Sequence, residues 1–348
     1  MRHFRSPTRD NDAGRATLDA MSQHAATRPV PSLQRKAAIA HAGGLDHRGE
    51  VKVAPIPGFD LGRTIFNTLS GRLPRYIMRT RIGKEPLWTE RAARDIERAY
   101  QAIEDRRRLP PIEPDLLRFM VDECDFDVEH ADGSFLDHLY FGFEYAALHY
   151  PTQSALVMLL HSILGTGTNT FAMPAAKIPT LRGLLSEHDW RHVEAFPSVL
   201  RLLYDLPMRA ELRANLGRLD DLKSIKLRRV IDNEAITLSG KDLFVQLNYQ
   251  LIHLIDFLPV ADWARNANDT AFILFRDLYD LLAKAGKRDA VVHYAPAHER
   301  WRDADSSSGI GPALTSLIPV SLSEKMAARQ VRQFSERIGH GMQYTLNW

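Results

Sequence analysis

The residues best suited to carry chemistry are histidines in apolar surroundings. Two of the 14 histidines among the 348 residues stand out: His138 in the segment FLDHL and His161 in the segment LVMLLHSILG. An imidazole in so apolar a segment lowers stability unless the ring is hydrogen-bonded or bound to something. A metal ion supplies such a partner, because imidazole is the commonest protein metal ligand. The alternative for each residue is a core histidine hydrogen-bonded to a neighbouring backbone or side-chain group.

Two consecutive helices are expected to carry these histidines. The apolar spacing predicts one helix over residues 135–150 and another over 153–164, with Pro151 between them. The second helix is almost wholly apolar, so we expect it to be buried.

A third expected helix, over 241–258, combines apolar residues with a polar stripe. At 100° per residue, Gln246, Gln250 and His253 share one side of this helix, with Asp256 at the margin. The stripe is either the only solvent-facing side of the helix or the lining of a buried polar pocket. In the second case Gln246 and Gln250 are candidate substrate-binding residues.

The rest of the body is also helical in pattern, and strand signals are few. Pro197 interrupts the pattern of one helix, and residues 228–237 fit a strand or a helix equally well. The predicted fold class is therefore all-α. Further helices are expected over 88–106, 113–122, 178–185, 189–204, 211–222, 269–285 and 322–338.

The segment 134–166 resembles the HD-domain superfamily of helical metal-dependent proteins, most of them phosphohydrolases and some of them diiron oxygenases. The family pattern is a His on one helix, then a buried apolar helix that ends in His-Asp and a glycine, then a distant Asp. FLDHL resembles the first part through His138, and LVMLLHSILGTG the second through His161. The resemblance implies a divalent metal (Fe, Mn or Zn) bound by His138, His161 and Asp256. In a bacterial branch with Ser after the second His, another His stands upstream, and His130 occupies that place.

Ser162 stands where the superfamily has its Asp. That carboxylate usually binds or bridges two metals, and a neutral hydroxyl is a poor replacement. A full two-metal centre is therefore not expected. Two outcomes remain: a single metal held by His138, His161 and Asp256, with His130 as a further ligand, or a site that has lost its metal. Three protein ligands and an open position suffice for catalysis, and His130 and Ser162 are then the candidate catalytic residues.

The run GTGTNTFA, residues 165–172, follows a helix rather than a strand. It lacks the lysine of a P-loop, so no nucleotide cofactor is expected. Gly165 suits the left-handed position of a helix C-cap. The alternative is a loop over the site, in which Thr166 and Asn169 contact the substrate.

A literal His-Asp pair occurs at His188-Asp189. His188 and His192 are four residues apart on one helix face and could bind a metal. Their polar surroundings favour two solvated residues on an amphipathic helix instead.

Composition and charge narrow the class of protein. Hydrophobic residues make up 45 % and charged residues 25 % of the chain, as in ordinary globular proteins. The first 50 residues hold eight Lys or Arg and five Asp or Glu, so the body is close to neutral and no nucleic-acid partner is expected. The lone Cys124 excludes an internal disulfide and a cysteine-rich zinc site, and fits a reducing, cytoplasmic setting. No apolar run approaches the 18 residues of a membrane span.

The domain organisation follows from the same patterns. Residues 1–48 lack hydrophobic periodicity and are expected to form a disordered basic tail. Residues 49–348 are expected to form a single helical domain. Its core, at about 115–260, resembles the HD-domain helical bundle, with additional N- and C-terminal helices.

Two functions are compatible with these residues. The first is an HD-like metal-dependent enzyme that acts on a small molecule by phosphoester hydrolysis or iron-dependent oxidation. The second is a non-catalytic helical binding or regulatory protein that has kept the fold and lost the metal.

Overall fold

The computed structural model describes most of the chain after residue 110. The described residues are 72–73, 76, 98, 110–124, 129–130, 133–166, 173–255, 268–292, 314 and 317–348, and the side chains of 121, 129–130 and 133–138 are not described. The predicted tail 1–48 and most of the predicted helix 88–106 lie outside these residues.

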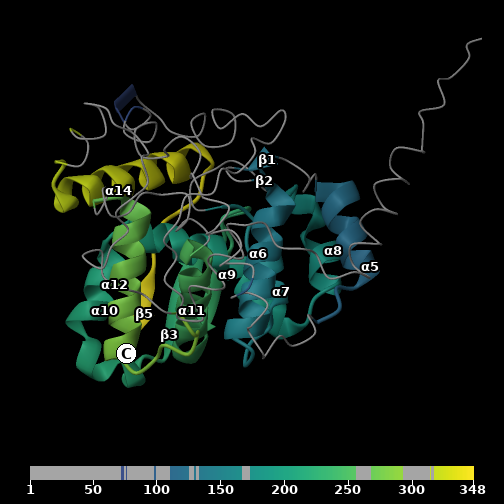
Figure 1. Cartoon of the computed structure of the whole chain (residues 1–348), viewed down its shortest axis with the longest axis horizontal. Helices are drawn as coiled ribbons and strands as arrows, with labels where there is room; N and C mark the ends of the chain where they lie inside the picture. The colour runs from purple at the N-terminus through teal and green to yellow at the C-terminus, as the bar shows by residue number, and fades with distance from the viewer. Residues whose placement is uncertain are drawn as a thin grey trace, which may run out of the picture.

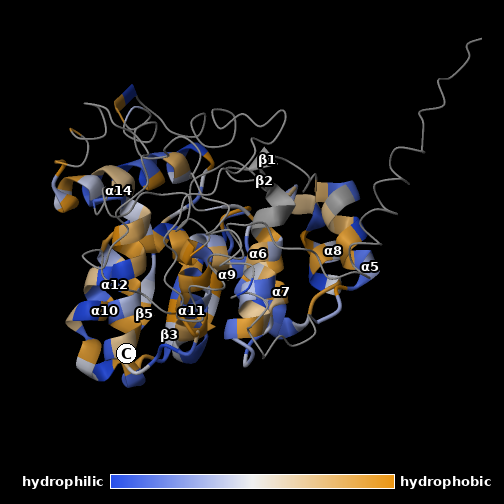
Figure 2. Ribbon diagram, viewed as in Figure 1, coloured by the Kyte–Doolittle hydropathy of each residue, from blue (hydrophilic) through white to orange (hydrophobic). Residues whose placement is uncertain are grey.

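Helices make up most of the described chain (Figure 1), so the expectation of a mainly helical protein is confirmed. The outer helices α10, α12 and α14 mix apolar and hydrophilic residues (Figure 2), as expected of helices with one face on the core. The helices are α5 (Pro114–Arg118), which continues into a π-helical turn (Phe119–Glu123), α6 (Phe135–His149), α7 (Leu156–Leu160), α8 (Ile178–Gly183), α9 (Glu187–Tyr204), α10 (Pro207–Ala214), α11 (Gly240–Ile255), α12 (Thr270–Lys284) and α14 (Val320–Arg337).

Helix α9 is central to the packing. It begins at Ser186, whose Oγ accepts a hydrogen bond from the Asp189 N–H at 3.1 Å. Every residue from Ala195 to Leu203 is buried, and the helix contacts α7, α10, α11, α12 and α14. Pro197 does not end the helix, although it removes one backbone hydrogen bond. The surrounding elements hold the helix together at this point.

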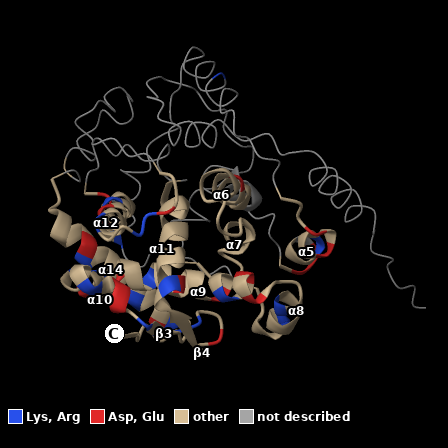
Figure 3. Cartoon of the chain, turned by 90° about the horizontal axis from the view of Figure 1, so that it is seen from below, with Lys and Arg blue, Asp and Glu red and all other residues tan. Residues whose placement is uncertain are grey.

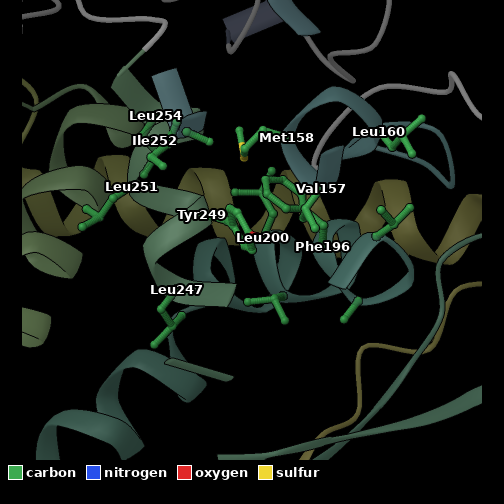
Figure 4. Packing of buried hydrophobic residues seen from close by; sticks show 14 of the residues in the cluster. Val157, Met158, Leu160, Phe196, Leu200, Leu247, Tyr249, Leu251, Ile252 and Leu254 are labelled. Atoms are coloured by element: carbon green, nitrogen blue, oxygen red, sulfur yellow. The ribbon is translucent and has the colours of Figure 1, made fainter. Parts of the chain in front are cut away.

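Helix α11 lies between α12 and α7 and crosses above α9 (Figure 3). Its apolar residues share one core with those of α7 and α9. Figure 4 shows Met158, Phe196 and Tyr249 within this core. Over its described part, α11 agrees with the helix predicted over residues 241–258.

Helices α6 and α7 pack against each other, joined by residues 150–155. A Cβ added at Gly142 would lie 3.2 Å from Met158 Cβ, so the two main chains approach closely there. Helix α7 is shorter than the predicted helix 153–164. Residues 161–164 form turns that follow the last residue of the helix, with His161 as its C-cap.

A small antiparallel sheet, which the all-α prediction did not include, packs on the helices. Its strands are β3 (Ser224–Arg228), β4 (Ala235–Ser239) and β5 (Thr345–Asn347), in the order β4-β3-β5. The ambiguous segment 228–237 contains the β3–β4 turn. A further pair, β1 (Glu129–His130) with β2 (Gly133–Ser134), precedes α6.

Within the described residues, we find no helix that is both long enough and apolar enough to cross a lipid bilayer.

Gly240, at the start of α11, allows a close approach between main chains. Its N–H donates to the Lys223 carbonyl at 2.8 Å, and an added Cβ would overlap the carbonyl oxygen of Leu222. We expect Gly240→Ala to lower the free energy of unfolding, measured in urea, by about 3 kcal/mol, because backbone atoms must shift. Gly183→Ala is the matched control, since nothing lies within 4 Å of its added Cβ. Its expected change is within about 0.5 kcal/mol. Equal effects of the two substitutions would contradict this account of Gly240.

Candidate functional site

Two buried elements bring His161 and His253 together. His161 follows the last residue of α7 and is 2 % exposed, whereas the half-buried His253 lies in the last turn of α11. Their ring centroids are 4.8 Å apart, and Phe196 of α9 contacts both rings, at 4.9 Å and 5.5 Å. We call His161 and His253 the histidine pair. The pair lies where three helices meet, which makes it the candidate site.

A hydrogen bond fixes the orientation and the tautomer of His161. Its Nδ1 lies 2.7 Å from the carbonyl oxygen of Met158. Because a carbonyl oxygen only accepts, Nδ1 carries the hydrogen in the neutral ring and Nε2 carries the lone pair. Such a bond from one ring nitrogen to a backbone carbonyl is the arrangement that orients histidine ligands of metals.

The polar stripe of α11 is inside the protein. Gln246 and Gln250 are fully buried, so of the two alternatives the stripe is not the solvent-facing side. The Gln250 amide donates to the Phe196 carbonyl at 3.1 Å and so joins the stripe to the helix that contacts the histidine pair. Gln246 lies about two turns from His253, at a second polar cluster.

That second cluster is formed around His192 of α9, which is fully buried. Its Nδ1 lies 3.2 Å from Gln246 Oε1, its Nε2 lies 3.8 Å from Asp242 Oδ1, and the His188 ring is 4.7 Å away. Burial, with a smaller contribution from His188, lowers the pKa of His192 to about 4, so the ring is neutral at pH 7. The expectation of two solvated histidines is therefore wrong for His192, because α9 turns this residue toward α11.

The remaining predicted ligands are described in part or not at all. The main chain of His138 lies in α6, four residues before Gly142, and His161 follows Met158 by three residues. Because α6 and α7 are consecutive and pack together, they run in opposite directions. At a rise of about 1.5 Å per residue, both histidines then lie on the same side of the Gly142–Met158 contact, at similar distances from it along the helix axes. The His138 side chain lies outside the described residues.

Asp256, Asn169 and the His130 side chain also lie outside the described residues. The main chain of His130 pairs with Gly133 in the β1–β2 ladder. Asp256 follows His253 by three residues, directly after the described part of α11. No group of three or more His, Cys, Asp or Glu side chains that could hold a metal occurs among the described residues.

Ser162 and Thr166 flank the turn that follows His161. Ser162 is 3 % exposed, so its hydroxyl lies in the interior next to His161. The Thr166 carbonyl accepts a hydrogen bond from Arg201 Nε at 2.9 Å. Gly165 has φ of 125°, a value that favours glycine, but it lies after the turns 161–164 and is not the C-cap of α7, which is His161.

A separate groove of about 580 Å³ lies on the surface between α8, α9 and β4. Trp190 forms part of its wall, with the guanidinium groups of Arg182 and Arg229 at 5.8 Å and 5.6 Å from the ring. The arginines of the groove pair with nearby carboxylates, among them Glu194 with Arg229 at 2.7 Å. None of the residues predicted from the sequence lines this groove, so it adds nothing to the candidate site.

Neither a ligand role for His253 nor the internal position of Arg201 was predicted from the sequence. His253 was visible as a member of the polar stripe, but the stripe did not show that His161 faces it. Arg201 was visible as a charged residue inside the apolar run SVLRLLY. A cation in such a run indicates an internal polar contact.

No family model matches the chain, and no curated protein or solved structure matches it either. The comparisons therefore add nothing to the chemistry that the residues of the site and the sequence resemblance suggest.

Burial of His192 predicts a loss of stability in mild acid. Its pKa is near 4 in the folded protein and about 6.5 when unfolded, so below pH 6.5 the unfolded state binds more protons. Between pH 7 and pH 5 this group alone should lower the free energy of unfolding by about 2 kcal/mol.

The measurement is urea unfolding at both pH values. In His192→Gln the loss of stability between them should be smaller by that amount. His188→Gln is the control, because it removes only the smaller contribution to the shift, so most of the wild-type pH dependence should remain. An unchanged pH dependence in His192→Gln would refute the assignment.

Proposed function

We propose that this chain is a metal-dependent enzyme of the HD-like helical type that acts on a small molecule by phosphoester hydrolysis. The observation that carries the proposal is the histidine pair, in which His161 is oriented by the Met158 carbonyl and lies 4.8 Å from His253 between α7, α9 and α11. The resemblance of segment 134–166 to the superfamily supplies the expected chemistry.

The proposed ligands are His138, His161 and Asp256, and the structure supports adding His253. Imidazole nitrogens with one carboxylate oxygen form a set that suits Fe, Mn or Zn. The main-chain position of His138, four residues before Gly142 in α6, and the place of Asp256 three residues after His253 in the sequence are compatible with this set. When bound, the metal would supply Lewis acidity toward a phosphoryl oxygen and toward water.

The chain's own residues position and shield such a site. The hydrogen bond to Met158 holds the His161 ring with its Nε2 lone pair in a fixed direction. Phe196 packs on both rings and excludes water from one side of the pair. Gln250, by binding the Phe196 carbonyl, fixes the relative position of α9 and α11. Ser162 supplies a neutral hydroxyl where the superfamily has a carboxylate, which favours one metal over two.

Iron-dependent oxidation is the second candidate reaction. The addition of His253 makes the set richer in nitrogen, and histidines with one carboxylate are typical of non-haem iron oxygenases. Both reactions use the same ligands, so the identity of the metal and the product distinguish them.

The full-length chain, purified without chelators, should contain about one Fe, Mn or Zn per molecule by elemental analysis. We expect His161→Ala and His253→Ala each to lower this content about tenfold or more, because each removes a ligand. His188→Ala should leave it unchanged, since His188 belongs to the cluster around His192. His161→Gln serves where the alanine variant does not fold, as judged by circular dichroism.

Release of phosphate from a generic phosphoester by the metal-loaded chain would support hydrolysis, whereas metal-dependent consumption of oxygen would support oxidation. A wild-type chain that neither contains nor takes up metal would refute the enzyme and favour the non-catalytic binding protein. Metal content unaffected by both alanine variants would place any metal elsewhere.

A further inference from the structure

Arg201 is the largest fully buried side chain among the described residues, and it belongs to α9. A guanidinium keeps its charge at every physiological pH, and a charge taken out of water lowers stability unless it is neutralised. The partners of Arg201 therefore decide what this residue does.

Every recorded partner of Arg201 is electrically neutral. Its Nε donates to the Thr166 carbonyl at 2.9 Å, and its Nη1 donates to Ser335 Oγ of α14 at 3.0 Å. The guanidinium carbon lies 4.8 Å from the centre of the Phe334 ring. Among the described residues, Nη2 has no hydrogen-bond partner and no carboxylate pairs with the group. Burial lowers the pKa of Arg201 to about 10, which still leaves it charged at pH 7.

The other buried arginines of the described chain differ in this respect. Arg209 pairs with Asp277 at 2.8 Å and with Glu324 at 2.9 Å. Arg229 pairs with Glu194 at 2.7 Å and has two further carboxylate partners. Among the described residues, each buried guanidinium other than that of Arg201 is thus neutralised by carboxylates.

The described residues around Arg201 offer it no counter-charge. His340 Nε2 donates to the Arg228 carbonyl at 3.0 Å, and burial with the charge of Arg201 lowers the pKa of His340 to about 4, so this ring is neutral. Asp205, one turn further along α9, pairs with Arg332. The region between α9, α14 and the turn at Thr166 therefore has a positive potential.

We infer that Arg201 binds an oxyanion, the carboxylate or phosphate group of a small molecule, through Nη2. Planar oxyanions match the geometry of a guanidinium, and a buried, charge-assisted pair of this kind is stronger than its neutral equivalents. The anion supplies the negative charge that Arg209 and Arg229 obtain from the protein. Nε and Nη1 are already held by Thr166 and Ser335, so the guanidinium is fixed in place before the anion arrives.

This site is distinct from the histidine pair. His161 contacts Phe196, whereas Arg201 is five residues further along α9, about 7.5 Å along the helix axis. The inference therefore stands without a bound metal, and it is tested on metal-free protein.

The test measures thermal unfolding of the full chain after treatment with EDTA and dialysis into chloride buffer. Sodium phosphate and sodium acetate are titrated separately in the millimolar range, with sodium chloride at matched ionic strength as reference. We expect one of the two anions to raise the Tm in a saturable manner, by roughly 5 °C at a hundred times its Kd. The responding anion distinguishes phosphate from carboxylate ligands.

Arg201→Met is the decisive variant, because it keeps the length of the side chain and removes the charge. It should lose the anion-dependent shift, and its Tm in chloride should equal or exceed that of the wild type. Arg209→Met is the matched control: it removes the guanidinium that pairs with Glu324 and shares Asp277 with Arg213, so its Tm should fall in every buffer while the anion-dependent shift persists.

The inference is overturned if neither anion raises the wild-type Tm above the chloride reference. It is also overturned if Arg201→Met keeps the shift, which would make Arg201 a structural cross-link between α9 and α14. Should Arg201→Met not fold, Arg201→Lys retains the charge and should weaken the saturating anion about tenfold through loss of the planar donor pair.

Discussion

The absence of a solvent-facing side on the second half of α9 is the constraint on which the surrounding structure depends. Between Ala195 and Leu203, each polar group of this helix has to be matched from inside the protein. Ser198 Oγ donates to the Arg228 carbonyl of β3 at 2.6 Å, and the Phe196 carbonyl accepts from Gln250 of α11. Arg201 binds the turn after His161 and the helix α14. Hydrogen bonds thus set where the sheet, α11, α14 and the turn after His161 lie against α9, and apolar packing fills the space between them.

The helices were predictable because their apolar residues recur with the period of a helix. Pro197 shows where local reasoning fails, since the tertiary contacts of α9 maintain the helix in spite of the proline. The strands were not predictable for a different reason. β3 pairs on one side with β5, so Ser224 meets Asn347 across more than a hundred residues, and no local pattern records such a partner. The end of α7 at Leu160 likewise depends on packing rather than on the apolar composition of the run that follows it.

The candidate site was predictable in its residues more than in its arrangement. The apolar run around His161 is enough to place this ring in the core. The contact with His253 depends on how α7 and α11 pack, and a sequence pattern does not contain that geometry. His192 is the instructive failure: its neighbours in sequence are polar, but the helix directs its ring toward Gln246 in the interior. The polarity of neighbouring residues in the sequence predicts the environment of a side chain well on an exposed helix and poorly on a helix that is covered on several sides.

The link between β3 and β5 also has a kinetic consequence. α14 and β5 reach their partners through contacts of very long sequence separation: Ser335 with Arg201, Arg332 with Asp205, and Leu346 with Ile225. Closing such large loops costs entropy that only a preformed docking surface recovers. The α9 helix and the β3–β4 hairpin must therefore assemble first, and the C-terminal helix and strand join them as a late cooperative unit. Partial unfolding should reverse this order. Hydrogen exchange at the β3 amides that face β5 should then report the release of the C-terminal helix and strand before the core unfolds.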